Sequence, residues 1–75
     1  MKFNERIRAL REDADKTQTE MALALGLTQR KISRLETAQN QPVLSDIEKY
    51  CFYFNLSADY ILGYTDKPIS LNKKQ

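Results

Sequence analysis

The chain has 75 residues, of which 41% are hydrophobic and 29% are charged. These proportions are typical of ordinary water-soluble domains and argue against disorder and against a membrane protein. Twelve Lys and Arg residues against ten Asp and Glu residues give a net charge of only +2, so overall charge does not indicate a polyanionic partner. A chain of this length has room for one domain.

Residue types that carry chemistry are scarce. Cys51 is the single cysteine and there is no histidine, so we expect no disulfide, no metal site, no cofactor and no catalytic residue. The N-terminal segment MKFNERIRALRE lacks the apolar run of a signal peptide, and no run approaches the ~20 apolar residues of a membrane span. We therefore expect a cytoplasmic protein that is not an enzyme and has no contact with a membrane.

The first two predicted helices follow from apolar spacing and capping residues. Four apolar residues recur at helical spacing and predict a first helix, at Phe3, Ile7, Leu10 and Ala14. Thr17, followed three residues later by Glu20, has the pattern of a capping box and predicts a second helix from Gln18 to Leu25.

The third predicted helix is the most polar. Gly26 can adopt positive φ and is expected to end the second helix and turn the chain. Thr28 is placed to cap a helix from Gln29 to about Thr37. Its apolar side consists of Ile32 and Leu35 only, and the rest of its circumference is polar or basic.

Two further helices complete the predicted fold. A fourth, with Ser45 or a neighbour near its start, follows from five apolar positions, Leu44, Ile47, Tyr50, Cys51 and Phe54. Asn55 is expected to end it in the left-handed conformation. Ser57 can cap a fifth helix, from Ala58 to Leu62, which Gly63 stops. The sequence predicts a compact all-α, five-helix domain over residues 1–64 and a short tail, 65–75, that is disordered or part of a dimer contact.

The two-helix unit in the middle carries a recognisable spacing. Helices joined by about four residues with a glycine cross steeply and need a small residue at their closest approach, and Ala22 stands there. With Gln18 as the first position, the glycine is ninth. The segment TQTEMALALGLTQRKISRLE resembles the helix-turn-helix of phage-repressor-like (XRE or Cro-type) DNA-binding domains. RIRALRE and LSADYILG resemble that family's first and closing helices, so the resemblance covers residues 3–63.

The resemblance implies that the third helix enters the major groove of a double-stranded DNA operator. It implies base contacts by Gln29, Arg30, Ser33 and Arg34. It implies phosphate contacts by Gln18, Thr28, Lys31, Gln39 and Asn40. The chemistry agrees, because glutamine can form two hydrogen bonds to adenine and arginine can form two to guanine. The alternative is that these polar residues are only the solvated face of a small helical protein.

Charge and one ion pair bear on the same interpretation. Residues 29–41 hold three cations against Glu36, a local charge of +2, which predicts weak and salt-sensitive DNA binding per monomer. In the family an ion pair, partly buried, often joins the positions of Arg11 and Glu36 and orients the recognition helix. The alternative is that both are solvated charges.

Two positions depart from the family. Its members usually have a glycine in the loop after the third helix, where this chain has Ala38 and Gln39. Asp15 stands where a glycine commonly ends the first helix, and aspartate can adopt the required left-handed conformation with some strain.

Unusual apolar residues suggest a partner surface. Leu23 and Ala24 lie on the usually polar side of the second helix, and Phe52 and Tyr53 on the usually solvated side of the fourth. We hypothesise a homodimer contact formed by Phe52, Tyr60 and Tyr64, with Ile69 or Leu71 from the tail. The alternative is that these aromatics complete a small core.

These observations predict a transcriptional regulator, a repressor or controller of bacterial or phage origin, that binds DNA as a homodimer. No small-molecule ligand is evident. Two other classes of function stay open. The first is a protein-binding helix-turn-helix module such as an antitoxin or assembly adaptor. The second, more remote, is an enzyme that uses one of the scattered carboxylates.

Overall fold

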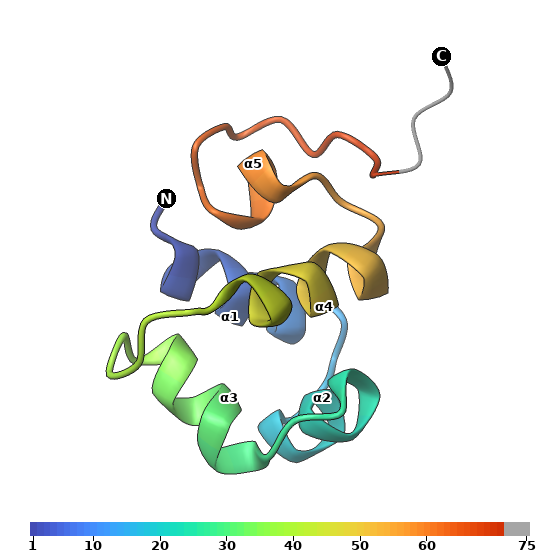
Figure 1. Cartoon of the computed structure of the whole chain (residues 1–75). Coiled ribbons are helices and arrows are strands. Elements are labelled where there is room, and N and C mark those ends of the chain that lie inside the picture. Colours follow the sequence, from blue (N-terminus) through green and yellow to red (C-terminus); the bar gives the residue numbers. More distant parts are fainter. Residues whose placement is uncertain (72–75) are drawn as a thin grey trace.

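A computed structural model describes residues 1–71 of the chain. Within that range lie five helices, α1 (Phe3–Asp13), α2 (Gln18–Leu25), α3 (Gln29–Glu36), α4 (Leu44–Phe54) and α5 (Ala58–Ile61). α2 and α3 lie at one end of the molecule, α5 and the tail at the other, and α1 and α4 between them (Figure 1). The prediction of an all-α, five-helix domain is confirmed.

The predicted caps of α2 and α3 are present. The Thr17 hydroxyl accepts from the backbone N–H of Glu20 at 3.1 Å, and the Glu20 carboxylate accepts from the Thr17 N–H at 2.8 Å. Hydrogen bonding to the carboxylate, first from the Thr17 backbone N–H and then from the Thr17 side chain, favours the ionised form and lowers the pKa of Glu20. Thr28 caps α3 by accepting from the N–H of Lys31 at 3.1 Å. These side chains satisfy amide groups that have no partner within their own helices.

α4 begins where the sequence predicted, with Ser45 near its start. The helix begins after Val43, whose side chain has no acceptor. The carboxylate of Asp46 instead accepts from the backbone N–H of Val43 at 3.1 Å. Asp46, in the first turn, thus satisfies the amide group of the residue that precedes α4.

Each of the five described helices is followed by a residue in left-handed backbone, which after α5 is Gly63 at φ +83°. Gly26 ends α2 with φ +69°, and Asn55 ends α4 with φ +56°, as predicted. Asp15 and Ala38 also have positive φ, at +56° and +63°. Asp15 thus adopts the conformation usual for glycine. Ala38 does so without a side chain that can bond its own backbone, which is the costlier case.

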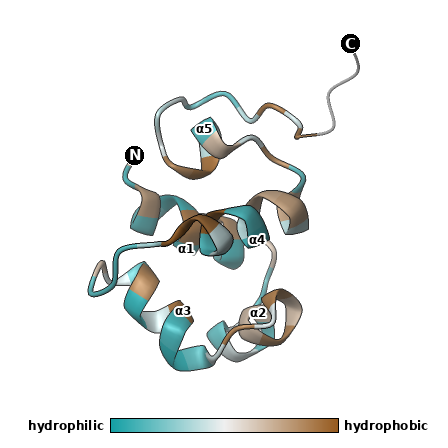
Figure 2. Ribbon diagram, in the orientation of Figure 1, coloured by the Kyte–Doolittle hydropathy of each residue, from teal (hydrophilic) through white to brown (hydrophobic). Residues whose placement is uncertain are grey.

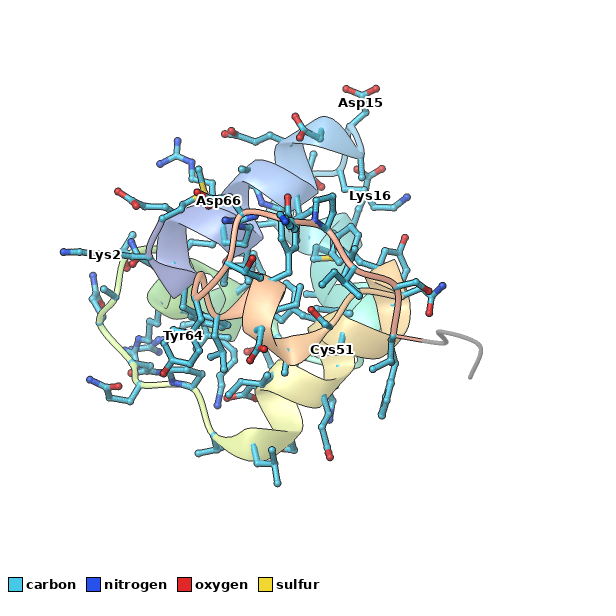
Figure 3. All side chains as sticks on the ribbon, turned by 90° about the horizontal axis from the view of Figure 1, so that it is seen from above. Lys2, Asp15, Lys16, Cys51, Tyr64 and Asp66 are labelled. Atoms are coloured by element: carbon cyan, nitrogen blue, oxygen red, sulfur yellow. The ribbon has the colours of Figure 1, made fainter. Side chains whose placement is uncertain are left out.

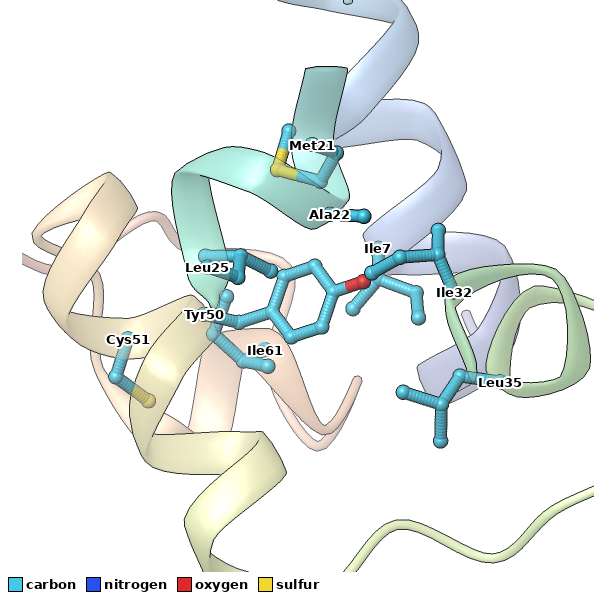
Figure 4. Close-up of a cluster of buried hydrophobic side chains, with 9 residues drawn as sticks. All are labelled: Ile7, Met21, Ala22, Leu25, Ile32, Leu35, Tyr50, Cys51 and Ile61. Atoms are coloured by element: carbon cyan, nitrogen blue, oxygen red, sulfur yellow. The ribbon is translucent and has the colours of Figure 1, made fainter. Parts of the chain in front are cut away.

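The core lies where α1 to α5 meet. Its buried side chains are Ile7, Met21, Ala22, Leu25, Ile32, Leu35, Tyr50, Cys51 and Ile61. The ring of Tyr50 stands at the centre, with its hydroxyl directed towards Ile7 and Ile32 (Figure 4). That hydroxyl is buried and has no hydrogen-bond partner among the described residues. Burial raises the pKa of Tyr50, because the phenolate is poorly solvated there.

The tail folds back on the domain. The N–H of Ser57 donates to the carbonyl of Ile69 at 2.8 Å, and the N–H of Leu71 donates to the carbonyl of Asn55 at 3.2 Å. Asp66 lies over α1 (Figure 3) and pairs with the buried Arg6 at 2.9 Å. Residues 65–71 are thus held against α1, α4 and α5, and the last four residues of the predicted tail lie outside the described part of the chain.

Candidate nucleic-acid interface

A close approach of α2 and α3 forms the corner of the two-helix unit. Past Gly26, the N–H of Leu27 donates to the carbonyl of Ala22 at 2.9 Å, and Ala22 is 4% exposed. Ile32 and Leu35 are fully buried and seat α3 on the core. Figure 2 shows the result, a mostly hydrophilic α3 beside a mostly hydrophobic α2. The small residue and the glycine at these two positions make this steep, close packing possible.

A chain of side-chain hydrogen bonds runs from α1 to the start of α3. Arg11 donates to both carboxylate oxygens of Glu36, from Nε at 2.7 Å and from Nη2 at 2.9 Å. Gln18 Nε2 donates to Glu36 Oε1 at 3.1 Å, and Gln29 Nε2 donates to Gln18 Oε1 at 2.6 Å. We call these four residues the glutamine relay. The predicted ion pair between Arg11 and Glu36 therefore exists, but it also anchors two residues predicted to contact DNA.

The glutamine relay is anchored by an ion pair that is largely buried. The side chain of Glu36 is 2% exposed and that of Arg11 is 12% exposed. The hydrogen-bonded carboxylate of Glu36 raises the pKa of Arg11, against the opposing effect of burial. A bidentate arginine–carboxylate pair of this kind is geometrically specific as well as strong. It fixes the end of α3 relative to α1 and α2.

The relay also fixes which way the two amides point. A carboxylate only accepts hydrogen bonds, so Gln18 must direct its NH₂ group to Glu36 and its oxygen to Gln29. Gln29 must then direct its NH₂ group to Gln18. The side-chain oxygen of Gln29 and one remaining N–H stay available to a ligand. The exposed Gln29 therefore presents one acceptor and one donor of defined order.

The other predicted base contacts lie on the outer side of α3. Arg30 is exposed, and Ser33 and Arg34 are half-buried. Arg30 and Arg34 are four residues apart and share one face of the helix. The exposed Thr28 and the half-buried Gln18 lie beside the start of α3. The structure thus brings together four of the nine residues predicted to contact DNA around the start of α3: Gln18, Thr28, Gln29 and Arg30. Ser33 and Arg34 follow on the same helix, and Arg34 lies in its last turn.

Lys31 lies on another side of the helix. Its Nζ is 3.4 Å from Asp46 Oδ2, and the Asp46 side chain is only 4% exposed. Asp46 is the same residue that caps α4. The sequence did not predict this pair. Helical spacing assigns Asp46 to a face of α4, but it does not show which residue of α3 that face contacts.

The loop after α3 places the last two predicted phosphate contacts. The backbone N–H groups of Gln39 and Asn40 both donate to the carbonyl of Arg34, at 2.8 and 3.2 Å. This closes the end of α3 through the left-handed Ala38. Gln39 is exposed and Asn40 is half-buried, and both lie at the opposite end of α3 from Gln29.

The apolar residues singled out in the sequence are divided between two places. Phe52 is 67% exposed and Leu23 is 80% exposed. Phe52 and Tyr53 of α4 line an open hollow of about 330 Å³ with Ala24 and Leu25 of α2 and with Lys49. Tyr64, near α5, is 79% exposed. Phe52 and Tyr64 therefore do not complete the core.

Tyr60 behaves differently. The guanidinium carbon of Arg6 lies 3.8 Å from the centre of the Tyr60 ring. This ring is half-buried and serves an intramolecular contact.

No cluster of potential metal ligands occurs in residues 1–71. Over the same range, none of the helices has the length and apolar character needed to cross a bilayer.

The family model described as a helix-turn-helix domain matches residues 3–60 of this chain. The chain belongs to the helix-turn-helix domain family. The match contains the whole of the α2–α3 corner and the glutamine relay, so the family predicted from the sequence is confirmed. No curated protein matches the chain at a significant level.

Among solved structures, the helix-turn-helix chain is similar to a transcriptional regulator from Listeria innocua. The TM-score is 0.78 at 20% sequence identity, and the similarity covers 91% of this chain. This chain spans 64% of the length of that regulator. At this identity the likeness shows a shared fold.

Proposed function

We propose that this helix-turn-helix domain binds operator DNA sequence-specifically in the cytoplasm and regulates transcription, as a repressor or controller without catalytic activity. The glutamine relay is the observation that carries the proposal. A buried ion pair holds an exposed glutamine in one orientation at the start of α3, beside the exposed Arg30. An ordinary solvated helix face does not require such an anchor. A helix that inserts the residues of its first turn into the major groove does.

The order of donor and acceptor on Gln29 favours adenine. The major-groove edge of adenine presents one acceptor, N7, and one donor, the N6 amino group. The free oxygen and the free N–H of Gln29 match this pair, whereas guanine presents two acceptors. We therefore propose that Gln29 reads an adenine in each half-site.

The remaining contacts divide by position. Arg30 and Arg34, with Ser33 between them, are proposed to contact base edges as α3 follows the groove. Gln18, Thr28, Gln39 and Asn40 are proposed to contact phosphates, since they flank the two ends of α3.

We also propose that two copies of the chain bind a two-fold site, with half-sites about one helical turn apart. The exposed Phe52 and Tyr64 are offered as dimer contacts, whereas Tyr60 contributes less because it already packs under Arg6.

Selection of bound sites from random duplexes, followed by fluorescence anisotropy, tests the function. We expect an inverted repeat, with adenine at one position of each half-site. Substituting purine for that adenine removes the N6 amino group and should weaken binding roughly tenfold, about the value of one lost bidentate partner. The same change should have little effect on a Gln29→Ala variant.

The double substitution of Arg30 and Arg34 by alanine should abolish the sequence preference. Lys67→Ala is the control, because Lys67 is an exposed cation in the tail, at the opposite end of the molecule. The proposal fails if the unaltered chain retains no duplex at low salt.

A protein-binding role is the second candidate, and the hollow between α2 and α4 favours it. An open, mainly apolar hollow of about 330 Å³, lined by Phe52 and Tyr53 among others, is suited to a partner side chain. In this case, alanine at Arg30 and Arg34 leaves the partner bound, and Phe52→Asp releases it.

A further inference from the structure

Lys31 and Gln29 lie on nearly opposite sides of α3. Residues two apart in a helix are separated by about 200° around its axis. The hydrogen bonds agree with this geometry, because Gln29 bonds to Gln18 of α2, whereas Lys31 pairs with Asp46 of α4. α3 is therefore held on both flanks by polar contacts. The side left between those flanks carries Arg30 and Arg34.

The Asp46 carboxylate that pairs with Lys31 is buried. Its side chain is 4% exposed, and besides Lys31 it bonds the backbone N–H of Val43 at 3.1 Å. A buried carboxylate is poorly hydrated and needs a cation nearby, so Lys31 is held more firmly than a lysine in an exposed pair. With Glu36 already paired to Arg11, the cations of α3 without an ion-pair partner among the described residues are Arg30 and Arg34.

We propose that Lys31 is a positioning residue: through Asp46 it sets the rotation of α3 against α4, and it does not contact phosphate. The proposal rests on the DNA-binding function proposed above and revises the phosphate role that the sequence suggested for Lys31. Its consequence is that Lys31 and Asp46 govern which bases Arg30 and Arg34 meet. They contribute little to the attraction between the protein and DNA in general.

Salt dependence separates the two roles. A residue that neutralises one phosphate adds about one to the slope of log affinity against log salt. Affinities are measured by anisotropy over a range of KCl concentrations, for the selected operator and for a scrambled duplex. We expect Lys31→Met to leave the slope unchanged, whereas replacing a lysine that neutralises a phosphate would reduce the magnitude of the slope by about one.

Selectivity provides the second readout. Lys31→Met and Asp46→Asn should each reduce the preference for operator over scrambled duplex roughly tenfold, the value of about one misplaced base contact. The double variant should lose no more than either single variant, because both break the same pair. Asparagine still offers an acceptor to Val43, which keeps α4 capped. Lys31→Arg should restore selectivity by keeping the cation.

Two results overturn the inference while leaving the DNA-binding function intact. One is a slope lowered by about one in Lys31→Met with selectivity preserved, which identifies a phosphate contact. The other is a loss of selectivity in the double variant equal to the product of the two single losses, which means that the two residues act separately. If the unaltered chain binds no duplex, both the function and this inference fail. Circular dichroism at the assay temperature confirms that each variant compared is folded.

Discussion

The recognition end of the molecule, formed by α2 and α3, and the opposite end, formed by α5 and the tail, each depend on an arginine of α1. At the recognition end, Arg11 meets a carboxylate that is 2% exposed. At the tail end, Arg6 is itself buried, but its partner Asp66 is 86% exposed. The two pairs have almost the same length, 2.7 and 2.9 Å.

Their surroundings make the two pairs unequal. Glu36 has little access to water and also holds Gln18, so loss of either partner strands a buried charge and releases the relay. Asp66 is solvated with or without Arg6. Arg6 also has the Tyr60 ring at 3.8 Å and the carbonyl of Thr65 at 3.4 Å. An ion-pair distance alone therefore says little about stability, and the exposure of the partner says more.

The largest expected effect is at Glu36. Glu36→Ala should lower the free energy of unfolding by about 3 kcal/mol or more, because the bidentate pair with Arg11 is lost at a buried site and Gln18 loses its acceptor. Urea denaturation followed by circular dichroism measures this. Glu12→Ala, which removes an exposed partner of Arg8, is the matched control and should change stability by less than about 0.5 kcal/mol. Equal losses in the two variants would remove the distinction between buried and solvated pairs.

The buried tyrosine between the two ends predicts a loss of stability in alkali. The folded protein holds the pKa of Tyr50 above its ordinary value of about 10, chiefly by burial. Below pH 10, Tyr50 is protonated in both the folded and the unfolded state, so its ionisation does not change the free energy of unfolding. As pH rises above 10, the unfolded state loses this proton first, and the free energy of unfolding falls by about 1.4 kcal/mol per pH unit. Tyr50→Phe should remove this part of the pH dependence, measured by urea denaturation at pH 9 and pH 11.

Tyr50→Phe should also leave stability at pH 7 unchanged or slightly higher, since the hydroxyl has no partner among the described residues. A marked loss at pH 7 would mean that the hydroxyl is bonded after all.

Backbone strain also distinguishes the two ends. Near α5, left-handed positions are occupied by Asn55 and Gly63, whereas the end of α3 has Ala38 at φ +63°. Ala38→Gly should therefore raise the free energy of unfolding by about 0.5 to 1 kcal/mol, the relief of strain less the greater entropy of an unfolded glycine. Asp15→Gly is the comparison and should gain less, because aspartate tolerates this region better. Thermal unfolding of both variants ranks them, and the reverse order would contradict the interpretation.

The smallest effect is expected at Asp66. Asp66→Asn should lower the free energy of unfolding by less than about 1 kcal/mol, because asparagine keeps an oxygen acceptor for the buried Arg6 and the other two contacts of Arg6 persist. Urea denaturation in parallel with Glu36→Ala gives the direct comparison. A loss as large as that of Glu36→Ala would show that the tail end depends on its ion pair as strongly as the recognition end does.

Local patterns predicted most of the fold because their causes are local. The cap at Thr17, the turn at Gly26 and the end at Asn55 depend on residues within four positions of each other, and each is present as predicted. The start of α4, near Ser45, also lies where it was predicted. The role of Asp46, three residues after Val43, as acceptor for the Val43 N–H was not predicted.

The candidate site divides in the same way. Sequence spacing alone placed Gln29, Arg30 and Arg34 on a polar helix after a sharp turn, since helical periodicity assigns residues to faces. Only the tertiary structure decided that Gln18 lies between Glu36 and Gln29, and that Lys31 turns to Asp46. These contacts join residues on different helices. Their geometry is set by how the core seats α3 against its neighbours, and the distances along the chain do not encode it.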